Sequence, residues 1–211
     1  GNNRNAVIST VRGCPFNCIY CHKTYIGYPI RFRSNASVLK ELQALHKAYD
    51  ITSFDFFDDL STLNKKRMIE FCRLKMKSEL APLPWTISAR VNLVDEELLR
   101  ALKKAKCVNV GFGLESMDQG VLDSINKKTR VEHAVKAVEL CEKLGVDISG
   151  SSFMIGFEGE SEETVRKSSD FCKAHRLRFE PHFMTPFPGT KLYEDCLRKG
   201  LIKDELGEPE P

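Results

Sequence analysis

Short β-branched or aromatic runs alternate with segments of helical periodicity along the 211 residues, and this alternation constrains the fold more than any other feature. The expected strands are residues 7–11, 54–57, 85–89, 108–112, 148–155 and 178–184. A helical pattern follows each strand, with apolar residues three or four positions apart, as in Val38, Leu42 and Leu45. Six strand–helix units of about 35 residues each predict a parallel sheet with right-handed crossovers.

Polar residues inside the expected strands distinguish an open sheet from a barrel. A doubly wound sheet is covered on both faces and would bury these polar groups, whereas a curved sheet with a polar lumen accommodates them. The polar positions are Asn109, Ser149, Ser151, Glu180 and His182. We therefore predict an α/β fold, a six-unit (β/α)6 partial TIM barrel with a parallel sheet, as one core domain over residues 1–203.

Composition and charge exclude several classes of protein. Hydrophobic residues make up 42% of the chain and charged residues 29%, which is ordinary for a globular domain. No apolar run approaches the ~18 residues that span a bilayer. A formal net charge of +3 is too small to indicate nucleic-acid binding. The first residues carry no apolar signal core, so we predict a cytoplasmic protein without a membrane span.

The two ends of the chain suggest a piece of a longer protein. The sequence begins with Gly1 rather than Met, which is typical of an excised domain. Residues 204–211 are rich in Pro and Glu, and we predict a flexible C-terminal tail there. The expected unit is a core domain followed by this short tail.

Three of the eight cysteines stand close together after the first expected strand: Cys14, Cys18 and Cys21. Their C-x3-C-x2-C spacing suits a [4Fe–4S] cluster with three thiolate ligands and a fourth iron left open. Structural zinc with His22 as a further ligand, and plain buried thiols, are the alternatives at this point. The other cysteines are expected to be buried small hydrophobic residues: Cys72, Cys107, Cys141, Cys172 and Cys196.

Residues 12–21, Arg-Gly-Cys-Pro-Phe-Asn-Cys-Ile-Tyr-Cys, resemble the signature of the radical S-adenosylmethionine (SAM) enzymes. The resemblance covers nearly the whole chain, from about residue 5 to residue 202. It continues through residues 57–59, 85–90, 113–116, 155–157 and 185–190. The pattern is most similar to the cobalamin-associated branch of that superfamily, and the methylthiotransferases are the next relatives.

The resemblance implies a definite chemistry. In such enzymes the open iron of the cluster chelates SAM, and one electron cleaves SAM to a 5′-deoxyadenosyl radical that takes hydrogen from a substrate. The outcome would be methylation, cyclisation or related radical chemistry, with a flavodoxin- or ferredoxin-type electron donor. The alternatives are a methylthiotransferase-like enzyme that modifies RNA or protein, and a non-catalytic metal- or SAM-binding module. The substrate is not identified.

The candidate site residues follow the expected strands at their C-terminal ends, where function collects in α/β barrels. The resemblance implies their roles by motif position. Cys14, Cys18 and Cys21 would bind the cluster. The SAM-binding roles would fall to Tyr20 on the adenine, Asp58 or Asp59 on the ammonium, Arg90 or Lys127 on the carboxylate, Ser88, Glu115 and Ser152 on the ribose, and the backbone near Gly156 and Met184 around the adenine.

Two departures from the branch pattern bear on these expectations. The usual Asp-Asp-Thr-Phe-Thr is replaced here by residues 58–62, Asp-Asp-Leu-Ser-Thr, and Glu158 stands where Pro is common. The first strand starts within about ten residues of Gly1, which leaves no room for the cobalamin-binding domain that usually precedes such a core. Cobalamin is therefore expected only through a domain absent from this chain.

Overall fold

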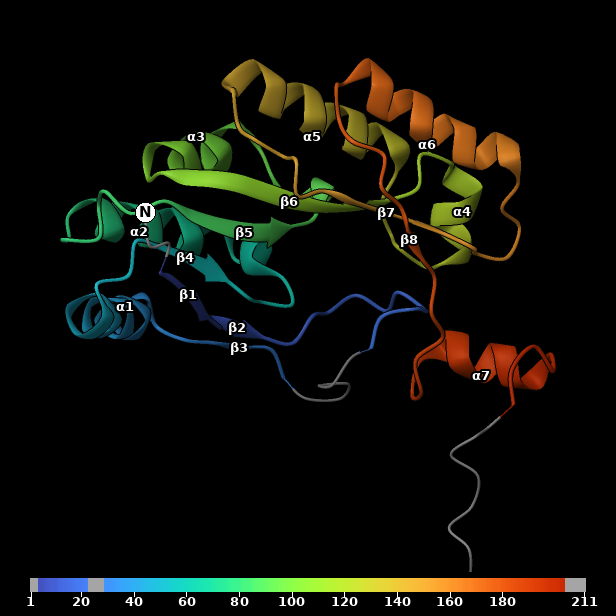
Figure 1. Ribbon diagram of the computed structural model, residues 1–211, viewed down its shortest axis with the longest axis horizontal. Helices are drawn as coiled ribbons and strands as arrows, with labels where there is room; N and C mark the ends of the chain where they lie inside the picture. Colours follow the sequence, from blue (N-terminus) through green and yellow to red (C-terminus); the bar gives the residue numbers. More distant parts are fainter. Residues whose placement is uncertain (1–3, 23–28, 204–211) are drawn as a thin grey trace, which may run out of the picture.

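A computed structural model describes residues 4–22 and 29–203 (Figure 1). Within these residues the main sheet is six-stranded and has the order β1-β4-β5-β6-β7-β8, with every neighbouring pair parallel. Its strands are β1 Asn5–Ile8, β4 Ser53–Phe56, β5 Trp85–Ala89, β6 Cys107–Glu115, β7 Ser152–Ile155 and β8 His182–Phe183. The sheet curls into a half-barrel, so the predicted partial TIM barrel is confirmed.

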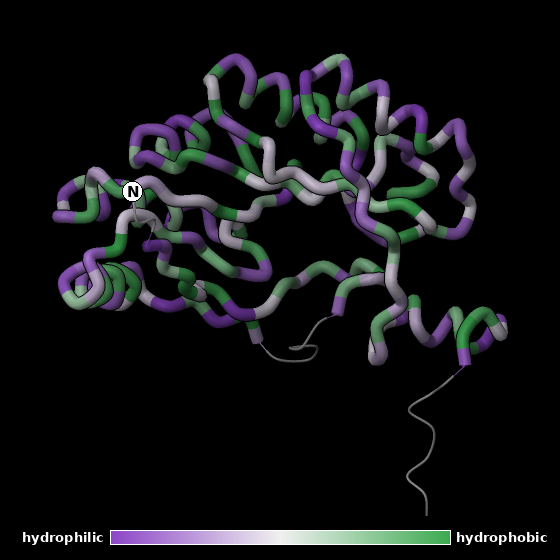
Figure 2. The backbone as a smooth tube through the Cα atoms, viewed as in Figure 1, coloured by the Kyte–Doolittle hydropathy of each residue, from purple (hydrophilic) through white to green (hydrophobic). Residues whose placement is uncertain are grey.

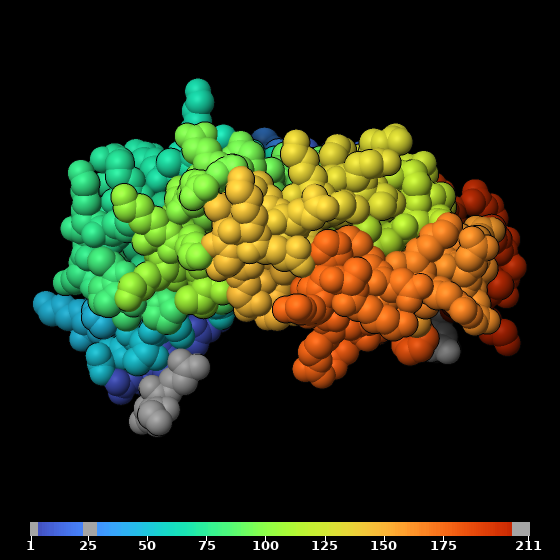
Figure 3. All heavy atoms as spheres, turned by 90° about the horizontal axis from the view of Figure 1, so that it is seen from above, coloured from blue at the N-terminus to red at the C-terminus, as the bar shows by residue number. Residues whose placement is uncertain are grey.

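Helices cover the outer face of this sheet, as Figures 1 and 3 show for α3, α5 and α6. The helices are α1 Asn35–Tyr49, α2 Lys65–Met76, α3 Glu96–Lys104, α4 Gln119–Ser124, α5 Val131–Leu144, α6 Glu162–Ala174 and α7 Lys191–Arg198, with 3-10 turns at Ser61–Leu63 and Val91–Leu93. Side-chain caps begin several of them. Asn64 accepts a hydrogen bond from the Arg67 N–H at α2, and Ser161 accepts one from Thr164 at α6. None of the described helices is long and apolar enough to cross a membrane.

The core lies between the sheet and its helices. Alternation along β5 buries Trp85, Ile87 and Ala89 toward the helices and leaves Thr86 and Ser88 on the concave face. Trp85 stacks on Phe54 at 5.6 Å between ring centroids. Along the helices, hydrophobic and hydrophilic residues also alternate, as the colours of Figure 2 show. The cysteines outside the loop are all buried, as predicted: Cys72, Cys107, Cys141, Cys172 and Cys196.

Several strand boundaries differ from the sequence prediction. The strand expected from residue 148 begins at Ser152, because Asp147 accepts hydrogen bonds from the Ser149 N–H and hydroxyl and holds a turn there. β8 is only two residues long, and His182 on it is exposed. β6 extends beyond the expected end at residue 112, to Glu115.

Two elements were not predicted. The chain after β1 forms a short antiparallel ribbon, β2 Val11–Arg12 with β3 Arg31–Phe32. The short helix α4 follows β6. Both elements border the cysteine loop, defined here as residues 13–22. α7 also lies beside this loop, apart from the other helices in Figure 1, because the Leu192 N–H donates to the Ile19 carbonyl at 3.0 Å. The tail predicted for residues 204–211 lies outside the described residues.

Candidate functional site

A cavity of about 310 Å³ opens between the cysteine loop and the C-terminal ends of the strands. The chain brings together here most of the side chains that the sequence singled out, from positions more than a hundred residues apart. Of the predicted residues, those lining it are Cys14, Cys18, Tyr20, Cys21, Asp59, Ser88, Arg90, Glu115, Lys127 and Ser152.

The loop is anchored to the end of β4 by two aspartates. Asp58 accepts hydrogen bonds from the N–H groups of Thr10 and Val11, at 2.5 and 2.9 Å, and from the Thr10 hydroxyl at 2.7 Å. Asp59 accepts one from the Gly13 N–H at 2.7 Å. Gly13 has φ +96°, a left-handed conformation that favours glycine, and it turns the chain into the loop. Asp58 is not among the residues that line the cavity, so its carboxylate positions the loop rather than facing a ligand.

A hydrogen-bonded triad forms one wall of the cavity. The Lys127 Nζ lies 2.6 Å from Glu115 Oε1, and both side chains are nearly buried, at 6% and 7% exposed. The Tyr20 hydroxyl donates to the same oxygen at 2.9 Å. Burial, followed by the nearby Glu115 carboxylate, raises the pKa of Tyr20, which therefore stays a neutral phenol. The triad ties the cysteine loop to the end of β6.

Glu115 adopts an unusual backbone conformation. Its φ is +65°, and the Ser116 N–H donates to the Leu114 carbonyl at 2.9 Å, which makes a γ-turn around Glu115. Such a turn is strained for a residue other than glycine, by about 1–3 kcal/mol. With this backbone conformation, the Glu115 carboxylate lies against Lys127 Nζ.

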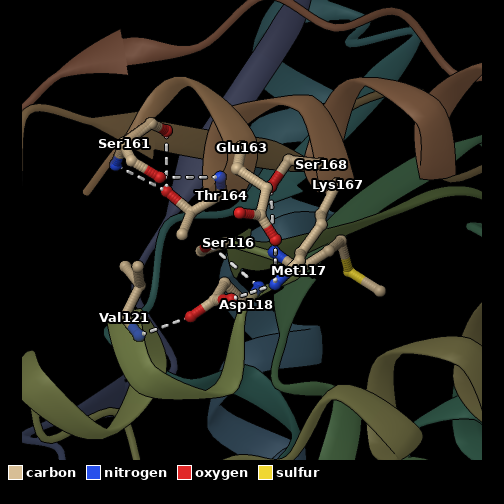
Figure 4. Close-up of polar contacts among 9 residues, drawn as sticks. All are labelled: Ser116, Met117, Asp118, Val121, Ser161, Glu163, Thr164, Lys167 and Ser168. Carbon is tan, nitrogen blue, oxygen red and sulfur yellow. Dashed lines mark hydrogen bonds and ion pairs between the residues drawn. The ribbon is translucent and has the colours of Figure 1, made fainter. Parts of the chain in front are cut away.

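The chain beyond Glu115 is held by α6 and α4 (Figure 4). The Met117 N–H donates to the hydroxyl of buried Ser168 on α6 at 2.9 Å, and the Asp118 N–H donates to the Ser116 hydroxyl at 3.1 Å. Asp118 also caps α4 through the Val121 N–H and pairs with Lys167 at 2.8 Å. These contacts fix the turn that presents Glu115.

Glycines keep one side of the cavity open. A Cβ added to Gly113 would lie 2.6 Å from Glu115 Oε1 and 3.0 Å from Lys127 Nζ, so any other residue there would displace the ends of both side chains. A Cβ on Gly111 would lie 2.9 Å from the Gly150 carbonyl oxygen. Sequence reasoning missed Gly111, Gly113 and Gly150 as site residues, although the Gly-Phe-Gly run on a predicted strand was a usable signal.

Arg90, at the end of β5, packs on the cysteine loop. Its guanidinium carbon lies 3.7 Å from the centre of the Phe16 ring, and its Nη1 lies 3.7 Å from the Cys18 Sγ. Its Nη2 donates to the Lys127 carbonyl. Phe16 was also missed from the sequence, although it stands inside the cysteine motif.

Gly156 and Met184 do not line this cavity. They border a neighbouring one of about 480 Å³, together with Ile19, Phe157 and residues of α7. Gly156 has φ +99°, and its N–H donates to the Glu160 carboxylate. Tyr20 spans the two regions, since its ring lies 5.5 Å from that of Phe157.

The donor set of the loop fits an iron–sulfur cluster. Cys14 and Cys18 are partly buried and Cys21 is exposed, and the three side chains lie on the wall of one cavity. Across residues 4–22 and 29–203, no three Cys, His, Asp or Glu side chains converge as the ligands of a single metal ion would. The thiolates of an iron–sulfur cluster bind separate iron atoms, whereas the ligands of zinc all bind one ion. Cysteine sulfurs that lie further apart from one another therefore fit a cluster better than they fit a zinc ion.

Comparison with known proteins decides the family. The sequence matches the family described as "Radical SAM superfamily" over residues 8–172, which is more than half of the chain. The chain belongs to the radical SAM superfamily. The predicted class, a radical SAM enzyme, is thereby confirmed, and the family implies a [4Fe–4S] cluster and SAM as cofactors.

Relatives of this radical SAM core include methyltransferases and a cyclase. An uncharacterized methyltransferase of Pyrococcus horikoshii is 37% identical over 198 residues, which are 93% of this chain and 43% of that protein. The anaerobic magnesium-protoporphyrin IX monomethyl ester cyclase of Rubrivivax gelatinosus is 32% identical over 206 residues, 96% of this chain and 37% of the cyclase. The chain thus spans about two fifths of the length of these relatives.

A solved structure confirms the fold. The radical SAM methyltransferase TsrM from Kitasatospora setae, determined with cobalamin and a [4Fe–4S] cluster bound, superposes with a TM-score of 0.80. The match covers 92% of this chain and 39% of TsrM, at 23% sequence identity. This likeness concerns the half-barrel itself.

Proposed function

We propose that this chain is the part of a radical SAM enzyme that binds a [4Fe–4S] cluster through Cys14, Cys18 and Cys21 and cleaves SAM for methylation or cyclisation of a substrate. One observation carries the proposal: three cysteines of one loop line a single cavity together with the charged and hydroxyl groups at the strand ends. When bound, the cluster would supply the electron that cleaves SAM, and the residues of the cavity would hold SAM in place for hydrogen abstraction from the substrate.

The residues of the cavity would hold the polar groups of SAM. Asp59 uses Oδ2 for the Gly13 N–H, and its other oxygen has no partner among the described residues, so it can accept from the SAM ammonium. Asp58 is less suited, because its oxygens already accept from Thr10, Val11 and Ser61. Ser88 and Ser152 offer hydroxyls to the ribose.

Other residues of the cavity would bind the carboxylate, the ribose and the adenine of SAM. Arg90 and Lys127 are the two cations of the cavity that could pair with the carboxylate, and the Glu115 carboxylate is an acceptor for the ribose. The Tyr20 ring would pack on the adenine of SAM. The backbone near Gly156 and Met184 would pack on the other face of the adenine.

The activity of the whole protein would need parts beyond this chain. The names of the relatives favour methyl transfer or ring closure on a small molecule. TsrM holds cobalamin as well as the cluster, and any cobalamin used here would be bound by a further domain. A flavodoxin- or ferredoxin-type protein would supply the electron.

The proposal is tested by rebuilding the cluster anaerobically with iron and sulfide and counting both per chain. We expect one [4Fe–4S] cluster in the unaltered chain and in the control Cys141→Ala, whose thiol is buried on α5. Cys14→Ala should lose the cluster. A single zinc ion per chain, or a cluster that survives in Cys14→Ala, would contradict the proposal.

A further inference from the structure

Arg90 carries a buried positive charge without a carboxylate partner among the described residues. The residue is only 7% exposed, yet no ion pair joins it to an Asp or Glu. Its nitrogens are held instead by neutral groups: the Lys127 carbonyl, the Asn92 side-chain oxygen at 3.4 Å, and the Cys18 Sγ at 3.7 Å. A buried charge is costly unless an opposite charge lies nearby. Within the part of the chain that the structure describes, no carboxylate therefore compensates the charge of Arg90.

The geometry shows where a compensating anion would lie. The guanidinium lies over the Phe16 ring, with its central carbon 3.7 Å from the ring centre. The bond to the Lys127 carbonyl fixes Nη2, so Nη1 is left aimed at the Cys18 sulfur. A cysteine that ligates a metal is deprotonated, which turns this sulfur into the missing negative partner.

We infer that Arg90 donates a charge-assisted hydrogen bond to the Cys18 thiolate of the bound cluster and raises the reduction potential of that cluster. The inference rests on the proposed function and adds a role for one residue within it. Reduction adds one negative charge to the cluster, and a nearby cation with an N–H···S bond stabilises the reduced form more than the oxidised form. Arg90 thus acts through the Cys18 sulfur, before any SAM is bound.

The test is a redox titration of the reconstituted protein without SAM, followed by electron paramagnetic resonance. Arg90→Gln removes the charge, and we expect the ratio of reduced to oxidised cluster at a fixed potential to fall about tenfold, which is about 59 mV for one electron. Arg90→Lys keeps the charge but not the planar fork, so its shift should be smaller and in the same direction. The matched control is Arg100→Gln, which removes a guanidinium that is paired with Glu96 on the exposed side of α3.

The possible results separate this inference from the proposed function. The inference would be overturned if the cluster has the same reduction potential in the unaltered chain and in Arg90→Gln and only the affinity for SAM falls. Arg90 would then be assigned to the SAM carboxylate alone. An equal shift in Arg100→Gln would also overturn it, because any distant charge would then suffice. If Arg90→Gln assembles no cluster, the reduction potential of the cluster in Arg90→Lys decides: a potential equal to that of the unaltered chain would overturn the inference. Absence of a cluster in the unaltered chain contradicts the proposed function instead.

Discussion

Removal of the Lys127 charge should expose how much the cavity wall depends on its buried ion pair. In Lys127→Met the unbranched side chain is one atom shorter and uncharged, so Glu115 is left as a carboxylate at 7% exposure without its cation. Breaking a buried pair in this way costs about 3–5 kcal/mol. Because the Tyr20 hydroxyl still donates to Glu115 at 2.9 Å, we expect the lower end, about 3 kcal/mol. For a chain of this size that corresponds to about 6–12 °C in Tm.

A double-mutant cycle measures the pair itself. Glu115→Gln keeps a side-chain oxygen for Lys127 and Tyr20 but leaves the buried Lys127 charge without a carboxylate, so its cost should also be about 3 kcal/mol. In the double variant the unpaired charge is gone, and the loss should be smaller than the sum of the single losses by at least about 1 kcal/mol. Denaturant unfolding at matched cluster content supplies the free energies, since bound cofactor would otherwise stabilise the variants unequally. Additive losses would refute the ion pair as the element that holds this wall.

Three further substitutions test other parts of the structure. Gly113→Ala should cost about 1 kcal/mol, because its Cβ would lie 2.6 Å from Glu115 Oε1 and the end of that side chain would have to shift; an unchanged unfolding midpoint would contradict the close packing. Asp58→Ala removes the acceptor of both backbone N–H groups of Thr10 and Val11, so iron retained after desalting should fall, whereas full retention would show that the loop needs no such anchor. Burial lowers the pKa of Lys75 to about 8, from 10.5 in the unfolded chain. The native protein therefore binds fewer protons than the unfolded chain between these values, and its free energy of unfolding should rise with pH from about 8 to 10.5, by up to about 3 kcal/mol. This pH dependence should be absent in Lys75→Met, and identical slopes in the two proteins would refute the low pKa.

The fold was predictable because hydrophobic periodicity records burial. β5 was predicted at its observed bounds, since Trp85, Ile87 and Ala89 alternate with polar residues. The β7 boundary was wrong because the hydrogen bonds of Asp147 create a turn inside an apolar run. The β2–β3 ribbon escaped notice, since two residues per strand carry no measurable period.

The candidate site was predictable in its membership but not in its contacts. Strand ends of a parallel sheet meet at one rim, which is why Cys14, Arg90 and Glu115 could be grouped from the sequence. Spacing does not reveal which of two adjacent carboxylates faces a cavity, so the different contacts of Asp58 and Asp59 required the structure. The positive φ of Glu115 likewise required the structure, as did the hydrogen bond from the Met117 N–H to Ser168 on α6 that holds the chain just beyond it.

The central claim, that this cavity joins a cluster to SAM, is tested most directly by one spectroscopic experiment. The reconstituted and reduced protein is examined by electron paramagnetic resonance before and after addition of SAM, and 5′-deoxyadenosine is measured in the same tube. We predict a reduced [4Fe–4S] signal that changes when SAM is added, with 5′-deoxyadenosine formed. A cluster signal that is indifferent to SAM, with no 5′-deoxyadenosine, would contradict the account.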